Sequence, residues 1–223
     1  MRFRLRSDFV DCYDHAFAGS WTGGPTWERM SRTTRTRVDD FIALKAAGFI
    51  TTGLASTGVA CARWGVDAIV VVYVDPHAHR GEGKVRMPAG RATREHPGAC
   101  CSRFVHTGER ATSFRLLLVG GFSVWLRYQA RDPDEWRSNV GEVRITPGDV
   151  DAASRAFLEP CGDRLARQLR APLLAVDFLP AEGTYLACDV NTAPGIQGTG
   201  LEGWLNPGDI AQLIERRAAA FGL

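Results

Sequence analysis

Two apolar segments near the end of the chain predict a β-hairpin. Residues 173–179 are apolar except for Asp177, residues 184–190 form the second segment, and residues 180–183 lie between them. Apolar runs of this length around a turn that contains Pro and Gly are typical of antiparallel strands. An aspartate in such a run is costly to bury unless it is paired or binds a ligand. Asp177 is therefore a candidate functional residue; the alternative is a surface hairpin in which it is only a polar interruption.

The register of this hairpin decides which polar side chains lie together. Successive side chains of a strand point to opposite faces, so Asp189 and Asn191 share a face. A four-residue turn at 180–183 puts Asp177 on the other face, whereas a five-residue connection at 180–184 pairs it with Ala187 and brings the three polar groups together. In that second arrangement Asp177 and Asp189 are diagonal neighbours, about 7–8 Å apart.

The side-chain types in this hairpin favour a magnesium–nucleotide site. Carboxylate and amide oxygens are the ligands of hard cations, and Mg²⁺ commonly bridges protein carboxylates to substrate phosphates. We therefore predict that Asp177, Asp189 and Asn191 bind the metal. The following turn contains Gly195 and Gly198, and glycine allows the backbone to approach a ligand closely.

Helices and strands alternate along the rest of the chain. The predicted strands are 66–74, 84–87, 102–106, 113–119 and 122–129; the predicted helices are 36–47, a short one ending at 93–96, 149–170 with interruptions at Pro160 and Gly162, and a last one beginning at Pro207. Residues 75–83 and 130–141 are predicted loops. Gly120-Gly121 is a strong two-residue hairpin signal, which would pair Arg115 with Leu126. This order, with its antiparallel hairpins, favours the α+β class.

The first predicted helix has clear signals at both ends. Thr36 is a suitable N-cap and Gly48 a suitable stop, and the apolar stripe between them consists of Val38, Phe41 and Ile42.

Composition and charge narrow the class of protein without indicating a partner. The chain has 223 residues, 45% hydrophobic and 23% charged, and a net charge of +2, which is ordinary for a soluble globular protein. Lys45 and Lys84 are the only lysines, so a lysine that binds phosphate must be one of these two. The six cysteines lack metal-ligand spacing and indicate reduced thiols. The longest apolar run, 68–74, is too short to cross a membrane. Without a signal-peptide core at the N-terminus, a cytoplasmic protein with no membrane partner is expected.

The metal-site residues resemble a motif of the ATP-grasp superfamily, most closely its amino-acid ligase branch, which includes the glutamate ligase that modifies a ribosomal protein. That family carries an Asp on one strand, then Glu-x-Asn about a dozen residues later and a Pro-Gly turn. Here Asp177, Asp189 and Asn191 precede Pro194-Gly195. Asp189 departs from the usual Glu and is one methylene shorter.

A second group of residues matches the same family. Upstream, the family shows an Arg on a strand, a Val-Gly hairpin and an Arg-Ser-Asn loop; this chain has Arg115, Val119-Gly120 and Arg137-Ser138-Asn139 in that order. The resemblance covers about residues 100–205 and implies an ATP-grasp-like α+β fold in which two lobes clasp a nucleotide. The chain is short for the family, and residues 1–98 do not clearly show the usual α/β domain before the ATP-binding lobes.

The resemblance also implies roles for individual residues. ATP and Mg²⁺, with Mn²⁺ as an alternative ion, would be the cofactors. Catalytic roles fall on Arg115, Arg137 and Asn139; nucleotide-binding roles fall on Lys84, Arg103, Phe104, Val105, Gly195 and Gly198; the metal ligands are Asp177, Asp189 and Asn191. The implied lobes are 1–65, a substrate or accessory segment, 66–106, a small ATP-binding lobe, and 107–223, the lobe with the metal site.

These assignments predict an ATP-dependent ligase that joins a carboxylate to an amine through an acyl phosphate. The substrates would be small molecules or peptides, and a homodimer is left open. One alternative keeps the fold as a kinase. Another is a binding module without turnover, for which Arg32, Arg35 and Arg37 could bind an anion or nucleic acid; a solvated basic turn is the preferred interpretation of that cluster.

Overall fold

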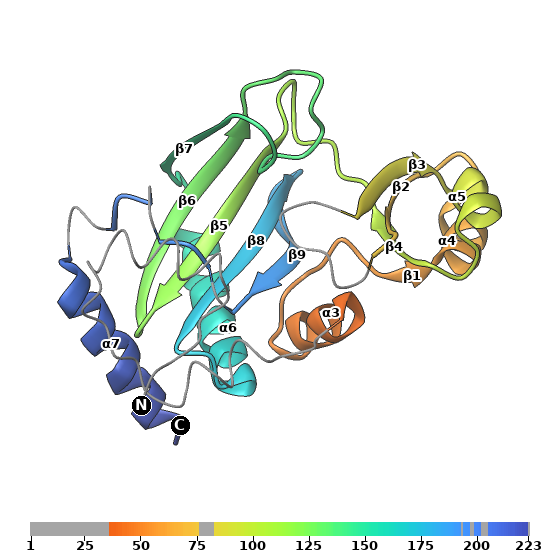
Figure 1. The fold of residues 1–223 in the computed structure, drawn as a ribbon. Helices are drawn as coiled ribbons and strands as arrows, with labels where there is room; N and C mark the ends of the chain where they lie inside the picture. The colour runs from red at the N-terminus through yellow and green to blue at the C-terminus, as the bar shows by residue number, and fades with distance from the viewer. Residues whose placement is uncertain (1–35, 76–82, 193, 197–198, 202–204, 223) are drawn as a thin grey trace.

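The computed structural model describes residues 36–75, 83–192, 194–196, 199–201 and 205–222. Two antiparallel sheets dominate the fold (Figure 1). The large sheet has the order β7 (Val143–Pro147), β6 (Phe122–Ala130), β5 (Thr112–Val119), β8 (Leu173–Ala181) and β9 (Thr184–Asn191). The small sheet has the order β1 (Ala55–Ser56), β4 (Cys100–Arg103), β2 (Ile69–Tyr73) and β3 (Lys84–Pro88). The helices are α3 (Arg37–Ala46), α4 (Thr57–Trp64), α5 (Ala89–Glu95), α6 (Ala152–Leu169) and α7 (Pro207–Ala220).

Helix α6 covers one face of the large sheet. Leu158 and Leu165 of α6 pack with Leu116 and Val176 of the sheet in the main core. A Cβ added at Gly162 would lie 2.9 Å from a methyl group of Leu118, so the glycine allows helix and sheet to approach closely. The expected interruption of this helix is wrong: α6 continues through Pro160 and Gly162, because its apolar face packs on the sheet along its length.

The opposite face of the large sheet is divided between an apolar end and a polar end. At one end Leu117 and Leu173 are buried under Ile210 and Ile214 of α7. Further along the same strands, on the same face, the polar residues include Arg115 and Asp177. The alternation of each strand therefore places a candidate site on the part of this face that α7 leaves uncovered.

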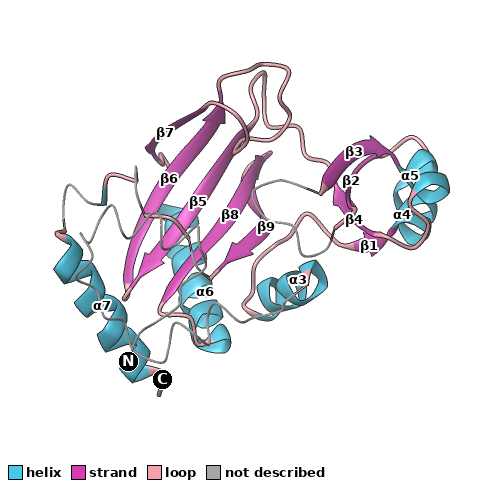
Figure 2. Ribbon diagram, in the orientation of Figure 1, coloured by secondary structure: helices cyan, strands magenta, loops and turns pink. Residues whose placement is uncertain are grey.

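In the small sheet, one face packs on α4 and α5 (Figure 2). Val70 and Val72 belong to that core. Val71 and Tyr73, which alternate with them, line a cavity on the other side of the sheet. Strand β2 therefore has two buried faces: one packs in the core with α4 and α5, and the other lines the cavity.

Helix α3 begins where the sequence predicts but buries only part of the predicted apolar stripe. Thr36 caps it in a capping box with Asp39. Of the predicted apolar stripe, Phe41 is buried at 2% exposure, whereas Val38 and Ile42 are 38% and 61% exposed. The buried face also includes Arg37, since α3 packs against β9 and α6.

The loop predicted at 130–141 is followed by strand β7, which was not expected from the sequence. The small sheet takes in residues from Ala55 onward, and the predicted lobe boundaries stay a prediction. Within the described residues, no helix combines the length and apolar character that a membrane span requires.

The β5–β6 turn offers a test of the packing under α7. Gly120 has φ +57°, and a Cβ there would lie 2.5 Å from Cβ of Leu213. At Gly121, with φ +107°, the nearest atom would be 3.9 Å away. We expect Gly120→Ala to lower the free energy of unfolding by about 3 kcal/mol, through overpacking and a left-handed backbone. Gly121→Ala, which is strained only in its backbone, should lower the free energy of unfolding clearly less, as measured by urea denaturation. Equal losses in the two variants would show that α7 moves to accommodate the added methyl group.

Candidate active site between the two sheets

Three charged side chains form a row across the large sheet. Arg115 on β5 pairs with Asp177 on β8, and Asp177 pairs with Asp189 on β9. Cross-strand partners point to the same face, and Asn191, two residues beyond Asp189, shares it.

The turn length and the strand register that were expected to produce this shared face are both wrong. The ladder begins with Ala181 opposite Thr184, so the turn is shorter than the predicted five-residue connection. A β-bulge between Asp177 and Phe178 then shifts the register, and Asp177 lies directly opposite Asp189 rather than on the diagonal. Bulges of this kind are common beside active sites, where they redirect a side chain.

Both oxygens of Asp177 are engaged by Arg115. Arg115 Nε donates to Oδ1 at 2.7 Å and Nη2 donates to Oδ2 at 2.9 Å, a two-pronged ion pair with side chains 14% and 15% exposed. Nη1 of Arg115 donates to Tyr128 Oη at 3.4 Å, and the guanidinium lies 4.8 Å from the centre of that ring. Arg115 thus fixes the orientation of the Asp177 carboxylate.

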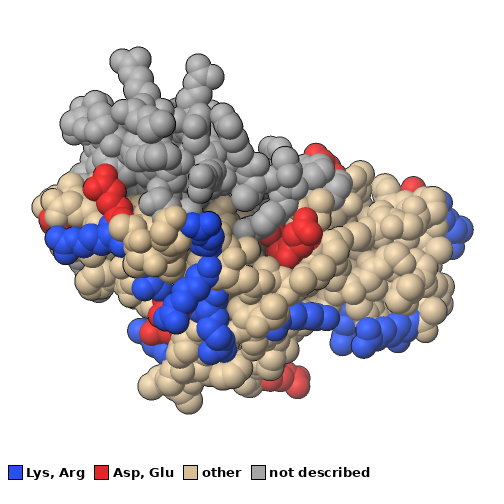
Figure 3. All heavy atoms as spheres, turned by 90° about the horizontal axis from the view of Figure 1, so that it is seen from below, with Lys and Arg blue, Asp and Glu red and all other residues tan. Residues whose placement is uncertain are grey.

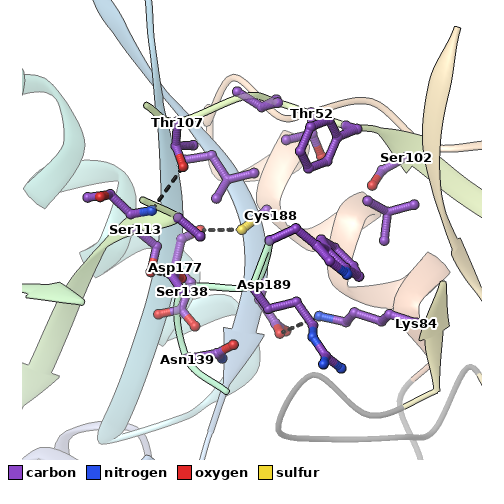
Figure 4. A pocket seen from close by; sticks show the side chains of 18 of the residues that line it. Thr52, Lys84, Ser102, Thr107, Ser113, Ser138, Asn139, Asp177, Cys188 and Asp189 are labelled. Atoms are coloured by element: carbon purple, nitrogen blue, oxygen red, sulfur yellow. Dashed lines mark hydrogen bonds and ion pairs between the residues drawn. The ribbon is translucent and has the colours of Figure 1, made fainter. Parts of the chain in front are cut away.

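The Asp189 carboxylate faces two cations, one from helix α3 and one from strand β3 of the small sheet. Arg37 on α3 donates to Oδ1, and Lys84 on β3 lies 3.6 Å from Oδ2 (Figure 4). Arg37 is only 5% exposed. The interpretation of Arg37 as a solvated basic residue is therefore wrong, while Arg32 and Arg35 lie outside the described residues.

The charges around Asp189 lower the pKa of its carboxyl. Burial by itself would raise that pKa, but the charges of Arg37 and Lys84 and the hydrogen bond from Arg37 outweigh it. A carboxylate with a lowered pKa stabilises the fold above its unfolded-state pKa, and this contribution is lost as pH falls through the folded-state pKa.

The fold should accordingly lose stability at acid pH, below about 4, the ordinary pKa of an aspartate. Urea denaturation near neutral pH and at about pH 3 should show a smaller acid-induced loss for Asp189→Asn than for the wild type. An equal loss in both proteins would mean that other carboxyls account for it.

A cavity opens between the two sheets, over this row of charges (Figure 4). Its lining includes eight of the predicted site residues: Lys84, Arg103, Phe104, Val105, Arg137, Asn139, Asp177 and Asp189. Arg115, Asn191 and Gly195 are not part of the lining, and Gly198 lies outside the described residues. Arg115 reaches the site through Asp177.

The Arg137-Ser138-Asn139 loop is tied to the large sheet by a buried hydroxyl pair. Ser138 Oγ donates to Ser113 Oγ on β5 at 2.6 Å. This bond places Arg137 and Asn139 on the cavity wall. The Arg137 guanidinium donates to both oxygens of Glu135 at 2.8 Å, so its position is set by its own loop.

Several lining residues were not singled out from the sequence. Thr52, Tyr73, Trp136 and Cys188 belong to this group. Tyr73 shares a 3.0 Å hydrogen bond with Ser102, and burial raises the pKa of its phenol, so it stays neutral. Burial, followed by the charges of Asp177 and Asp189, raises the pKa of the Cys188 thiol well above its usual range, so Cys188 is not a thiolate nucleophile.

Thr52 is the lining residue that most directly indicates a ligand. Its Oγ1 is buried and has no hydrogen-bond partner in the structure, the only such side-chain atom found among the described residues. Buried hydroxyls are nearly always bonded, and an exception inside a cavity suggests a missing partner. No local signal at Thr52 would have revealed this, because its burial results from the pairing of 50–52 with β9.

The donor set fits a hard cation that arrives with a negatively charged ligand. Asp177, Asp189 and Asn191 offer carboxylate and amide oxygens, the chemistry that Mg²⁺ prefers. Both carboxylates already face cations, and the described residues hold no group of three or more His, Cys, Asp or Glu suited to a metal. These oxygens alone are therefore a poor site for a bare ion.

The chain has two α+β lobes around a cavity that contains paired carboxylates. Its similarity to solved ATP-grasp structures shows that it has the ATP-grasp fold, as the sequence resemblance implied. D-Alanine–D-alanine ligase from Bacillus anthracis matches with a TM-score of 0.61 at 9% identity, covering 83% of this chain and 67% of that one. ATP-grasp ligase PsnB matches with a TM-score of 0.58 at 15% identity, covering 88% and 66%. D-Cycloserine synthetase DcsG gives 0.54 at 16% identity, covering 81% and 68%.

These likenesses concern the fold. The chain spans between 66% and 68% of the length of these three solved structures. No protein-family model and no curated protein matches the sequence.

Proposed function

We propose that the protein is an ATP-dependent ligase that joins a carboxylate to an amine. The observation that carries this proposal is the row Arg115–Asp177–Asp189, which lies under a cavity in an ATP-grasp fold. Two of the similar structures were solved with ATP, or with a precursor, Mg and ADP. The buried hydroxyl of Thr52, which has no partner in the structure, is a further reason to expect a polar ligand here.

The residues divide into two groups by what they can do. Asp177, Asp189 and Asn191 would hold Mg²⁺ or Mn²⁺, which would screen the charge of the triphosphate. Lys84, on the cavity wall beside Asp189, would bind phosphate oxygens. At the other end, Arg103, Phe104 and Val105 would surround the adenine, with Gly195 and Gly198 near the nucleotide.

Arg137 and Asn139 face the same cavity from the loop that Ser138 anchors. They would orient the substrate carboxylate and the transferred phosphoryl group, while Arg115 would hold Asp177 in position. Positioning and charge neutralisation are most of what phosphoryl transfer requires of a protein.

The reaction would proceed in two displacements. A carboxylate oxygen attacks the γ-phosphorus of ATP, the bond from that phosphorus to the bridging oxygen breaks, and ADP leaves. The amine nitrogen then attacks the acyl carbon, the bond from that carbon to the phosphate oxygen breaks, and phosphate leaves. The proton lost from nitrogen passes to solvent.

A coupled ADP-release screen of the purified protein, with amino acids and short peptides as acids and amines, tests this proposal. Rapid ADP release that requires both an acid and an amine, together with an amide product by mass spectrometry, would support a ligase. ADP release with a single acceptor and no amide would indicate a kinase instead. Absence of turnover with every pair, together with salt-dependent binding to RNA or DNA, would favour the binding module.

The described charges give the binding module little support. On the face that Figure 3 draws, the Lys and Arg side chains form separate groups with Asp and Glu among them. Arg37, from the cluster that suggested nucleic-acid binding, faces Asp189 instead.

A further inference from the structure

We infer that Arg37 and Lys84 keep this site from binding a divalent cation until a polyphosphate arrives with it. The inference deepens the proposed function and rests on it for the identity of the polyphosphate. It concerns Arg37 in particular, which lies outside the part of the chain that resembles the ligases in sequence.

Arg37 is built into the fold rather than placed on its surface. It is the first residue of α3, whose start is fixed by the Thr36–Asp39 capping box. Its guanidinium contacts Asp189 and lies 3.6 Å from Asp40, both through Nη1. The same guanidinium is 5.9 Å from the ring centre of Tyr73, on the small sheet.

Lys84 approaches the same carboxylate from the other sheet. Its ammonium lies 3.6 Å from Asp189 Oδ2 and 5.7 Å from the ring centre of Tyr73. The distance to Oδ2 exceeds that of a normal hydrogen bond, so the attraction is ionic and easily exchanged for a phosphate oxygen. Lys84 is therefore the cation that an incoming phosphate would take first, while Arg37 keeps its hold on Oδ1.

The charges of the six described residues of this cluster balance. Asp40, Asp177 and Asp189 contribute three negative charges, and Arg37, Lys84 and Arg115 contribute three positive ones. A bare divalent cation would have to enter beside these cations without surplus negative charge from these six residues to attract it. A polyphosphate supplies that charge and offers oxygens both to the metal and to Lys84. Metal and polyphosphate should consequently bind together and poorly apart.

Electron paramagnetic resonance of Mn²⁺ measures this directly, without turnover. We expect wild-type protein to bind Mn²⁺ weakly alone, and at least about tenfold more tightly with inorganic tripolyphosphate or a non-hydrolysable ATP analogue. Arg37→Gln should bind Mn²⁺ alone about tenfold more tightly than wild type, because it removes a positive charge beside Asp189. Lys84→Met should also bind Mn²⁺ alone more tightly than wild type, and Arg37→Lys should bind it with an affinity near that of wild type.

Two controls keep the result specific. Arg63→Gln, which removes an exposed arginine of α4, should leave Mn²⁺ binding unchanged. Adding Asp189→Asn to Arg37→Gln should abolish the increase in Mn²⁺ affinity. If Arg37 only supported the fold, its loss would weaken Mn²⁺ binding, which is the opposite sign. Should Arg37→Gln fail to fold, Lys84→Met still decides the outcome.

The inference is wrong if neither Arg37→Gln nor Lys84→Met binds Mn²⁺ alone more tightly than wild type. It is also wrong if wild-type protein binds Mn²⁺ equally well with and without tripolyphosphate. These results are independent of the ligase proposal. If the ADP-release screen fails but Arg37→Gln binds Mn²⁺ more tightly than wild type, the ligase proposal is wrong and the inference about Arg37 and Lys84 is still supported.

Discussion

Replacing Asp177 with alanine is expected to lower the free energy of unfolding by about 3 kcal/mol and to abolish ADP release. The stability loss follows from Arg115, which would keep its charge in a site where it is 14% exposed and lose both hydrogen bonds to the carboxylate. Loss of one partner of a buried ion pair is far more damaging than loss of both. Urea denaturation followed by circular dichroism measures the change.

The exposed pair Arg131–Glu142, with side chains 66% and 81% exposed, supplies the matched control. Glu142→Ala should change stability by less than about 1 kcal/mol. The double replacement Arg115→Met with Asp177→Leu should recover most of the stability and still release no ADP. If Asp177→Ala is no less stable than Glu142→Ala, the Arg115–Asp177 pair does not hold the sheet as described.

Asp189→Asn is expected to reduce the rate of ADP release on the order of a thousandfold, equivalent to about 4 kcal/mol of transition-state stabilisation. The amide has nearly the same shape but lacks the charge that faces Arg37 and Lys84. It would also be a weaker ligand for a hard cation. Stopped-time assays at saturating ATP, with the acid and amine found by the screen, measure the loss.

Asp67→Asn provides the comparison, since Asp67 is an exposed carboxylate on the small lobe and should retain full activity. Some loss of stability is expected in Asp189→Asn, because Arg37 stays buried after it loses the charged carboxylate that it contacts. The assay is therefore run well below the unfolding transition. Activity within a few-fold of wild type would remove Asp189 from the site.

Local signals predicted much of the fold. Gly120-Gly121 predicted both the β5–β6 hairpin and the pairing of Arg115 with Leu126, and both are confirmed. Thr36 and Asp39 likewise mark the start of α3. In each case the cause lies within a few residues of the effect, in turn geometry or in a cap.

The missed features depend on distant contacts. Arg37 and Asp189 are separated by 152 positions in the sequence, and nothing near Arg37 shows that α3 packs against β9. Pro160 reads locally as a break, yet the packing of α6 on the large sheet keeps the helix continuous. The bulge beside Asp177 has no glycine or proline at its position to announce it.

That bulge has a bearing on how similar sites should be sought in other genomes. Without it, the ladder that starts from Ala181 and Thr184 would set Asp177 opposite Cys188, eleven positions along the chain. With it, the carboxylate that faces Asp177 lies twelve positions away. A search pattern that fixes a single spacing would pass over chains that reach the same geometry with a regular hairpin, so both spacings belong in it.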